Sequence, residues 1–381
     1  MTDDEPPVLT AVSSSARQLF LLLRCITFSN KAHVTISDQG LKFSVSEGSS
    51  MEASTFLNKS LFTTYNFHAP VLERNEISDS EDDESDPPTS PNFQISLPAL
   101  LETLQIFGLT DPNTAKPPWA RDNPYPTSTA FSNNVLGMNN LCRISYPELG
   151  APLSIILTEA SIRTTCDLST YEPEYSEEIP FDRRDVVMKT IMRGSWLHDA
   201  LSELSSTSPE KLTMYAKSVR GKPFFAIAAS GTLGSARVEF NNQPHAFAAG
   251  NAVSTHPHDV SDPQTNLLET FQLSDPDHVL RSSYKFALIQ KAARAMSLAK
   301  KVSIRMDSQG VLSLQFMIEV EAPNAASGGA GSSEKLSFVD FVVVPMVEDD
   351  DDDADGAEGD ADETLMMNGH GGGSGDDDME S

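Results

Sequence analysis

The sequence has few cysteines and no long apolar run. Its three cysteines, Cys25, Cys142 and Cys166, include no C-x-x-C pair, so the spacing predicts neither a disulfide framework nor a cysteine-bound metal. The longest apolar run, Leu19–Leu23, is far too short to span a bilayer. The acidic, polar start Met1–Pro7 is not typical of a signal or transit peptide. We therefore expect a soluble intracellular protein with buried thiols.

Signatures of nucleotide and acyl-transfer enzymes are also missing. The sequence has no G-x-G-x-x-G after an expected strand, no G-x-x-x-x-G-K-[ST] loop and no nucleophile elbow. Basic residues do not form a localisation cluster, because Arg183-Arg184 and Lys300-Lys301 are only pairs. These absences favour a binding or scaffold protein without a cofactor or a metal.

Negative charge is concentrated in two segments. The net charge is −28, but Glu348–Ser381 holds 15 acidic residues and no Lys or Arg, and Glu73–Asp86 holds eight acidic residues and one Arg. Without those segments the remaining net charge is −6. The part that folds is only mildly acidic, so the overall charge is compatible with nucleic-acid binding. Whether a surface can bind nucleic acid then depends on where Lys and Arg lie on it.

Four segments have too few large apolar residues to offset the entropy of ordering them. We interpret residues 75–91, 110–134 and 241–264 as loops inserted into a compact fold, and 348–381 as a disordered acidic tail. Ser78, Ser80 and Ser85 lie among acidic residues, a context that acidophilic kinases favour, and are candidate phosphorylation sites. The alternatives are an unregulated solvated loop and a tail that only keeps the chain soluble.

The rest of the chain alternates helical and strand periodicity. Apolar spacing and capping residues predict four helices, at Ser13–Ile26, Pro98–Phe107, Ser195–Ser206 and Ile289–Ala299. Alternating apolar residues predict strands at His33–Ser37, Gly40–Ser46, Ser60–Phe67, Asn92–Leu97, Leu141–Tyr146, Leu153–Leu157, Ser161–Leu168, Val186–Met192, Leu212–Ala216, Phe224–Ser230, Ala236–Phe240, Tyr284–Leu288, Val302–Met306, Val311–Val320 and Lys335–Pro345. The order strand, helix, strands occurs four times, which indicates a duplicated α+β fold.

Several of these stretches resemble a known family. Lys301–Ile318 (KVSIRMDSQGVLSLQFMI) carries the strongest likeness, and Ile95–Gly108 (ISLPALLETLQIFG) and Phe338–Pro345 support it. Together with Arg17–Phe28 and His33–Val45, they resemble eukaryotic DNA sliding clamps, and more closely the Rad-one (Rec-one) subunit of the nine-one-one DNA-damage checkpoint clamp. The likeness covers roughly Val12 to Val347, outside the three loops.

This resemblance implies a ring of subunits, each with two similar domains whose sheets form the outer wall and whose helices line the hole. It places the domains at residues 12–180 and 181–347. The partners implied are a Rad-nine-like and a Hus-one-like subunit, a loader containing the Rad-seventeen-like protein, repair enzymes and double-stranded DNA. The implied role is nuclear: loading at recessed DNA ends to promote checkpoint kinase signalling and repair. The implied subunit edges lie before Tyr171 and near Thr213–Ser218.

A clamp must hold DNA without reading its sequence, which requires Lys and Arg facing phosphates. In the helix at 289–299, Lys291 and Arg294 lie opposite the apolar face, and Lys301 follows on the same side. Arg17 and Arg24 are seven residues apart and so share one side of the first helix. We predict that these five residues face DNA; the alternative is ordinary solvated helix faces. The other two helices carry mainly acidic charges, which Lys189 and Arg193 would offset.

Two other functions remain open at this point. A 3′-to-5′ exonuclease would need several carboxylates converging on metal ions, and the candidates Asp167, Asp307, Glu319 and Asp340 form no Asp-x-Glu pair. A homotrimeric replication clamp would share the fold but form its ring alone. We rank both below the heterotrimeric checkpoint clamp.

Overall fold

The computed structural model describes residues 6–14, 16–70, 90–106, 141–159, 162–174, 178–219, 221–241, 267–320 and 335–347. The predicted acidic tail and, apart from Ser90, Pro91 and Asn241, the three predicted loops lie outside these ranges. Among the described helices, none combines the length and the apolar character that a bilayer crossing requires.

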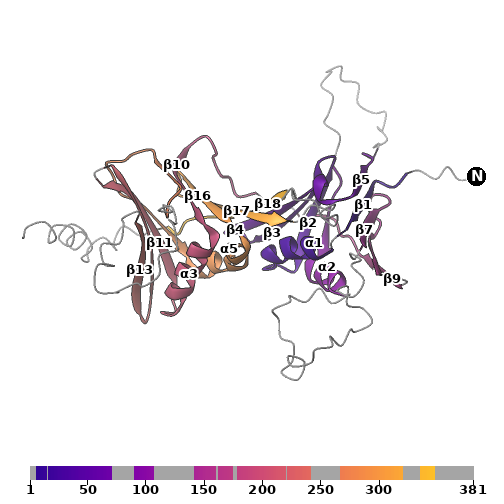
Figure 1. The fold of residues 1–381 in the computed structure, drawn as a ribbon, viewed down its shortest axis with the longest axis horizontal. Coiled ribbons are helices and arrows are strands. Elements are labelled where there is room, and N and C mark those ends of the chain that lie inside the picture. The colour runs from indigo at the N-terminus through magenta and orange to yellow at the C-terminus, as the bar shows by residue number, and fades with distance from the viewer. Residues whose placement is uncertain are drawn as a thin grey trace, which may run out of the picture. The chain divides into compact units, whose positions relative to one another are not determined.

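The chain repeats the order strand, helix, strands four times (Figure 1). The first repeat has β1 (Leu9–Ser13), α1 (Ala16–Leu23), the 3-10 turn η1 (Arg24–Ile26), β2 (Lys31–Ser37), β3 (Gly40–Glu47), β4 (Met51–Asn58), η2 (Lys59–Leu61) and β5 (Thr64–Phe67). The second has β6 (Asn92–Ser96), α2 (Leu97–Leu104), β7 (Leu141–Tyr146), β8 (Leu153–Glu159) and β9 (Ile162–Leu168). The third has β10 (Val186–Arg193), α3 (Gly194–Ser205), β11 (Lys211–Val219), β12 (Lys222–Gly231), β13 (Gly234–Asn241) and β14 (Thr270–Leu273). The fourth has β15 (Leu280–Lys285), α4 (Phe286–Gln290), α5 (Ala293–Leu298), β16 (Lys301–Asp307), β17 (Leu312–Val320) and β18 (Lys335–Val343).

The described strands form three antiparallel sheets. Their orders are β5-β1-β7-β8-β9, β14-β10-β16-β17-β18-β4-β3-β2-β6 and β13-β12-β11-β15. The nine-stranded sheet joins the two halves of the chain, because β18 pairs with β4 from Val339↔Thr55 to Val343↔Met51. Strands distant in sequence thereby share one continuous backbone hydrogen-bond network, which fixes the two halves to each other at this seam.

Each sheet buries one face, and the helices cover the buried face of the nine-stranded sheet. In β4 the side chains of Met51, Ala53 and Leu57 are buried while their neighbours are not, as the two-residue period of a strand requires. Helix α3 packs on α5 so closely that a Cβ on Gly194 would lie 2.5 Å from the Ala299 carbonyl oxygen. Glycine is therefore required where α3 begins.

An aromatic cluster lies in the core beside the seam. Phe316 on β17 is fully buried, and its ring meets that of Phe341 on β18 edge-on, with 5.6 Å between centroids. The Phe28 ring, from the turn after η1, lies 6.3 Å from Phe341 on the other side. Side chains from the beginning and the end of the chain thus contribute to one core.

Some predicted boundaries were wrong. The first helix begins at Ala16 and not near Ser13, because Leu9–Ser13 is a short strand whose alternate side chains are buried. The strand predicted at Ser60–Phe67 begins only at Thr64, after a 3-10 turn. The strand predicted at Tyr284–Leu288 ends at Lys285, since its apolar run continues into α4. The sequence also missed β4 and β14; in β4, Ala53 and Thr55 make the alternation weak.

Candidate nucleic-acid interface

The helices contact one another in a row that runs across both halves of the chain. Helix α2 contacts α1, η1 contacts α5, and α5 contacts α3. Figure 1 shows these helices on the same side of the sheets. The apolar side chains of α1 point into the core, where Leu19, Leu22 and Leu23 are buried. The opposite face of α1 is therefore the one turned away from the core.

Arg17 and Arg24 are both exposed, as the seven-residue spacing predicted. Arg17 belongs to the first turn of α1, and Arg24 opens the 3-10 turn η1. The Arg24 guanidinium lies 5.7 Å from the centre of the Phe20 ring, a cation–π distance that orients the long side chain. The first helix thus presents two cations away from the core.

The helix predicted at 289–299 is broken at Lys291, and Arg294 lies in the first turn after the break. Helix α4 ends at Gln290 and α5 begins at Ala293, so Lys291 is the residue that caps α4. The Lys291 ammonium forms an ion pair with Glu47 and lies 5.4 Å from the centre of the Phe28 ring. Lys291 and Arg294 are both half-buried, which holds them more firmly than a fully solvated side chain would be held.

The fold brings Arg294 and Arg24 together although they are far apart in the chain. Burial raises the pKa of the Cys25 thiol to about 12, while the charges of Arg294 and Arg24 both act to lower it. Arg24 and Cys25 are neighbours in η1, and α5, which carries Arg294, contacts η1. Arg24, Lys291 and Arg294 form a cationic cluster where the helices of the two halves meet, and we call it the junction cluster.

Lys301 is not part of a helix. It is the first residue of β16, and its ammonium lies 2.5 Å from a carboxylate oxygen of Glu269. In β16 the buried apolar residues are Val302, Ile304 and Met306, so Lys301 belongs to the strand face turned away from the core. The helix therefore ends before Lys301. Its role toward DNA stays a prediction, and a weaker one than for the junction cluster.

Helices α2 and α3 carry little positive charge. Glu102 is the only charged residue of α2, and α3 carries Asp199, Glu203 and His198. Arg193 precedes α3 and stacks on Trp196, with 4.9 Å between guanidinium carbon and ring centre, so it stays beside this helix. Lys189 does not lie beside α3. Its neighbours Met188 and Thr190 are buried, so Lys189 lies on the opposite face of β10. The expected offset by Lys189 is therefore wrong.

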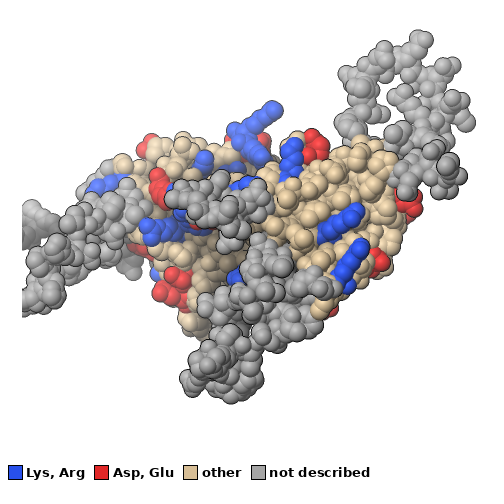
Figure 2. All heavy atoms as spheres, turned by 45° about the vertical axis from the view of Figure 1, so that its right-hand side comes forward, with Lys and Arg blue, Asp and Glu red and all other residues tan. Residues whose placement is uncertain are grey.

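The arrangement suits contact with a charged backbone and not the reading of bases. Figure 2 shows Lys and Arg side chains scattered over the face in view, with acidic side chains between them. Scattered cations with acidic side chains among them offer no fixed set of donors and acceptors in the pattern of base edges. The sequence did not reveal Glu47 and Phe28, which hold Lys291, because they lie more than 240 residues away in the chain.

The carboxylates considered for metal-dependent hydrolysis do not converge. Asp167 accepts a hydrogen bond from the Ser154 hydroxyl, on a different sheet from the others. Asp307 is buried and accepts backbone N–H groups of Asp182, Gln309 and Val311. Glu319 pairs with Lys300, and Asp340 accepts from the Gln315 amide at 2.8 Å. Within the described residues no group of three His, Cys, Asp or Glu side chains is placed to hold a metal ion.

Two of the strands at sheet edges suit assembly with other chains. Strand β9 ends the five-stranded sheet, which agrees with an edge before Tyr171. The edge expected near Thr213–Ser218 was wrong, because β11 is paired on both sides, with β12 and β15. The edge on the side of β12 is β13, Gly234–Asn241, two strands further along the meander. The candidate phosphorylation sites Ser78, Ser80 and Ser85 lie outside the described residues.

Comparison with known structures supports the predicted fold. PCNA from Thermococcus kodakaraensis superimposes with a TM-score of 0.53 at 16% sequence identity, over 89% of this chain and 100% of that one. At this identity the likeness concerns the fold alone. It confirms the α+β sliding-clamp fold that the four repeats predicted.

Sequence comparison finds relatives over most of the chain. The DNA damage checkpoint control protein rad1 of Schizosaccharomyces pombe is 30% identical, over 87% of this chain and 84% of that protein. The human cell cycle checkpoint protein RAD1 is 27% identical, over 84% of this chain and 89% of that protein. The DNA repair exonuclease REC1 of Mycosarcoma maydis is 21% identical, over 89% of this chain and 96% of that protein. The model of the family described as repair protein Rad1/Rec1/Rad17 matches residues 8–318, and the chain belongs to this family.

Proposed function

We propose that this protein is one subunit of a heterotrimeric clamp that encircles DNA and acts as a scaffold in the DNA-damage checkpoint. The observation that carries the proposal is the row of helices across both halves, beside which Arg17 and Arg24 are exposed and Lys291 and Arg294 are half-buried. The family and the checkpoint names of its relatives support the same role.

The geometry explains how such a subunit would work. The sheets provide a stiff wall, and the helix row carries Arg17 and the junction cluster. Phosphate contacts of this kind bind any sequence and exchange readily along a duplex. A ring that surrounds DNA is retained by its topology, so the individual contacts need not be strong.

Assembly of the ring needs exposed strands that pair with neighbouring subunits. Strand β9 lies at one edge of the five-stranded sheet, and β13 lies at one edge of the four-stranded sheet. An open edge presents unpaired backbone N–H and C=O groups to a partner strand. We assign β9 and β13 as the two interfaces, one toward a Rad-nine-like subunit and one toward a Hus-one-like subunit.

The proposed setting is the nucleus, at damaged or recessed DNA. A loader containing the Rad-seventeen-like protein would place the ring, and repair enzymes and the checkpoint kinase pathway would use it as a platform. The boundary between the domains 12–180 and 181–347 falls in the connection between β9 and β10 and is part of this proposal.

Co-expression with the two partner subunits tests the proposal. We expect a complex with one copy of each chain by native mass measurement, retained on nicked circular DNA and released when the circle is cut. A homotrimeric replication clamp is the alternative with the same fold. A stable ring formed by this chain alone would favour that alternative and contradict the heterotrimer.

An exonuclease is the second alternative, because one relative is named a DNA repair exonuclease. The dispersed carboxylates argue for a scaffold, since two-metal hydrolysis requires acidic ligands at one point. We expect the purified chain to leave 3′-labelled DNA intact in the presence of magnesium. Degradation that follows the protein through purification and disappears in Asp307→Asn or Asp340→Asn would overturn this assignment.

A further inference from the structure

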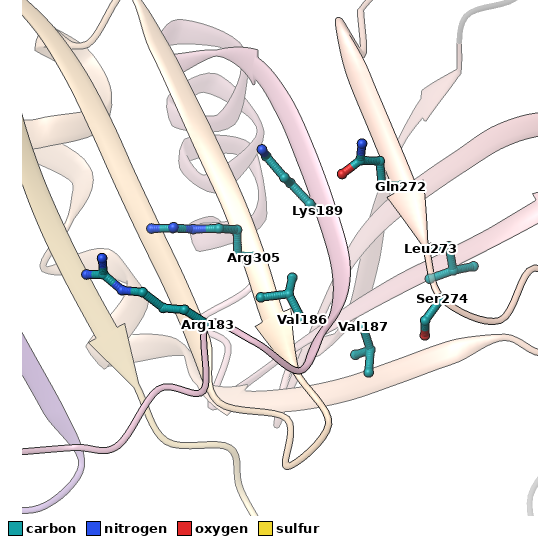
Figure 3. A pocket seen from close by; sticks show the side chains of 8 residues that line it. All are labelled: Arg183, Val186, Val187, Lys189, Gln272, Leu273, Ser274 and Arg305. Atoms are coloured by element: carbon teal, nitrogen blue, oxygen red, sulfur yellow. The ribbon is translucent and has the colours of Figure 1, made fainter.

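A pocket on the outward face of the nine-stranded sheet is lined by three cations. Its volume is about 400 Å³, within the range of small-ligand sites of roughly 300–1,000 Å³. Arg183, Lys189 and Arg305 provide the charge, and Gln272 and Ser274 add neutral polar groups. Figure 3 shows the guanidinium groups of Arg183 and Arg305 extending in the same direction, with Lys189 on the neighbouring strand. We call these residues the cationic pocket.

Strand register places the polar groups side by side. Gln272 on β14 faces Lys189 on β10, and Lys189 faces Arg305 on β16. Directly paired side chains of an antiparallel sheet lie on the same face, with Cβ atoms about 4.5–5.5 Å apart. Two like charges in such a pair destabilise the sheet when nothing neutralises them. The fold therefore keeps a repulsive pair where a neutral one would pack better.

Three carboxylates close in sequence to these cations are engaged by other groups. Asp182 accepts from the Arg184 backbone N–H, Asp185 accepts from the Ser308 hydroxyl, and Asp307 accepts backbone N–H groups. Within the described part of the chain, no carboxylate lies in ion-pair distance of Arg183, Lys189 or Arg305. Cations near the helices differ, since Lys291 and Lys301 each pair with a glutamate.

Arg305 is held in place with unused hydrogen-bonding capacity. Its Nη2 donates to the Ser313 hydroxyl at 3.1 Å, and its guanidinium lies 5.6 Å from the centre of the Phe181 ring. Its Nε is buried and has no hydrogen-bond partner among the described residues. Burial lowers the pKa of Arg305, the charge of Asp340 raises it, and Arg183 lowers it further. One carboxylate thus acts on two guanidinium groups, and the cluster keeps an excess of positive charge.

We propose that the cationic pocket binds the phosphate of a phosphorylated serine or threonine in a peptide segment of a partner protein. Guanidinium groups pair with phosphate through parallel hydrogen bonds, and a lysine adds a compact charge. Val186, Val187 and Leu273 line the same pocket and suit the apolar side chains beside a phosphorylated residue.

A peptide fits the pocket better than a nucleic acid does. Single-stranded nucleic acids are held by several aromatic side chains on which successive bases stack. None of the lining residues is aromatic, and the ring beside the pocket, Phe181, already lies against the Arg305 guanidinium. The pocket also lies on the sheet face turned away from the core, since Met188 and Met306 on the same strands are buried. It is therefore separate from the helix surface proposed to face DNA, and the inference does not depend on that role.

Binding to an immobilised peptide library tests the proposal. The library has a central phosphoserine with degenerate flanking residues, and the matched libraries carry serine or aspartate at the centre. We expect the full-length chain to be retained only by the phosphoserine library and to be released by millimolar inorganic phosphate. Lys189→Gln with Arg183→Gln should reduce retention at least tenfold, and Lys189→Arg should retain binding. The control Lys222→Gln alters an exposed lysine outside the pocket and should leave binding unchanged.

Folding is checked by thermal melts in phosphate-free buffer. Because Lys189→Gln removes the repulsion with Arg305, this variant should melt at or above the temperature of the wild type. Phosphate should raise the melting temperature of the wild type and not that of the double variant. Equal retention on the serine library, or unchanged binding by a folded double variant, would refute the site. A single-stranded oligonucleotide and a soluble phosphopeptide are compared as competitors that release the chain from the phosphoserine library, at equal concentrations of phosphate groups. If the oligonucleotide releases the chain at the lower concentration, nucleic acid is the ligand and the peptide assignment is overturned.

Discussion

Replacing Phe316 with alanine is expected to lower the free energy of unfolding by about 3–5 kcal/mol, the cost of emptying a large aromatic site in a packed core. The ring is fully buried and meets Phe341 edge-on, beside the strand that joins the two halves of the sheet. The loss would remove both buried area and the aromatic contact. For a unit of about 345 residues, this corresponds to a decrease in melting temperature of roughly 4–7 °C.

Phe338 provides a matched control one strand away. It is the same residue type on β18, but 39% of it is exposed on the other face of the sheet. Phe338→Ala should change the melting temperature much less, because little buried area is lost. Calorimetry on both variants makes the comparison. Equal losses for the two phenylalanines would show that the Phe316 ring is not part of a tightly packed core.

Reversing the charge of Arg17, Arg24, Lys291 and Arg294 together should strongly weaken retention of the assembled clamp on circular DNA at moderate salt. If each cation neutralises one phosphate, the four account for a slope of about 3.6 in log affinity against log salt, or roughly 100-fold between 50 and 200 mM. Replacing the same four residues with glutamine should weaken retention on DNA by an intermediate amount. The measurement is the half-life on nicked circular DNA across a salt series.

Four cations on strands and loops make the control for this experiment. They are Lys42, Arg184, Lys211 and Lys222. Their combined reversal changes the net charge equally but leaves the helix row intact, and it should preserve most of the salt dependence. Lys291→Glu places a second carboxylate beside Glu47, and the two charges repel each other. The melting temperature of each variant clamp is therefore compared with that of the wild type before retention on DNA is measured. If reversal in the helix row leaves retention unchanged while the clamp stays folded, DNA does not contact these side chains.

Long periodic segments made most of the fold predictable. The helices at 98–107 and 195–206 and most strands of the second half, though not β14, were placed within a few residues, because their apolar spacing repeats over two or more turns or alternations. Short or weakly apolar strands such as β1 and β4 were missed or merged into neighbours. In β4 alternation uses Ala53 and Thr55, whose preference for burial depends on the strands that flank them.

The candidate interface was predictable only in its local part. Arg17 and Arg24 share a side by helical spacing, so the sequence identified them together. The contact between η1, which carries Arg24, and α5, which carries Arg294, joins segments that are far apart in the chain, and no local pattern encodes such a contact. The break at Lys291 also depends on context, since the apolar period runs through it without interruption.

By itself the sequence determined the repeated order of strands and helices, the family likeness and the sign of each helix face, since these depend on local periodicity and on residue identity. Only the tertiary structure decided which strands remain at sheet edges, that Lys189 turns away from the helices, and that Lys189, Arg305 and Arg183 gather in one pocket. Pairing between distant strands sets those neighbours. The register of a sheet brings side chains together according to hydrogen bonding and core burial, whatever their separation in the chain.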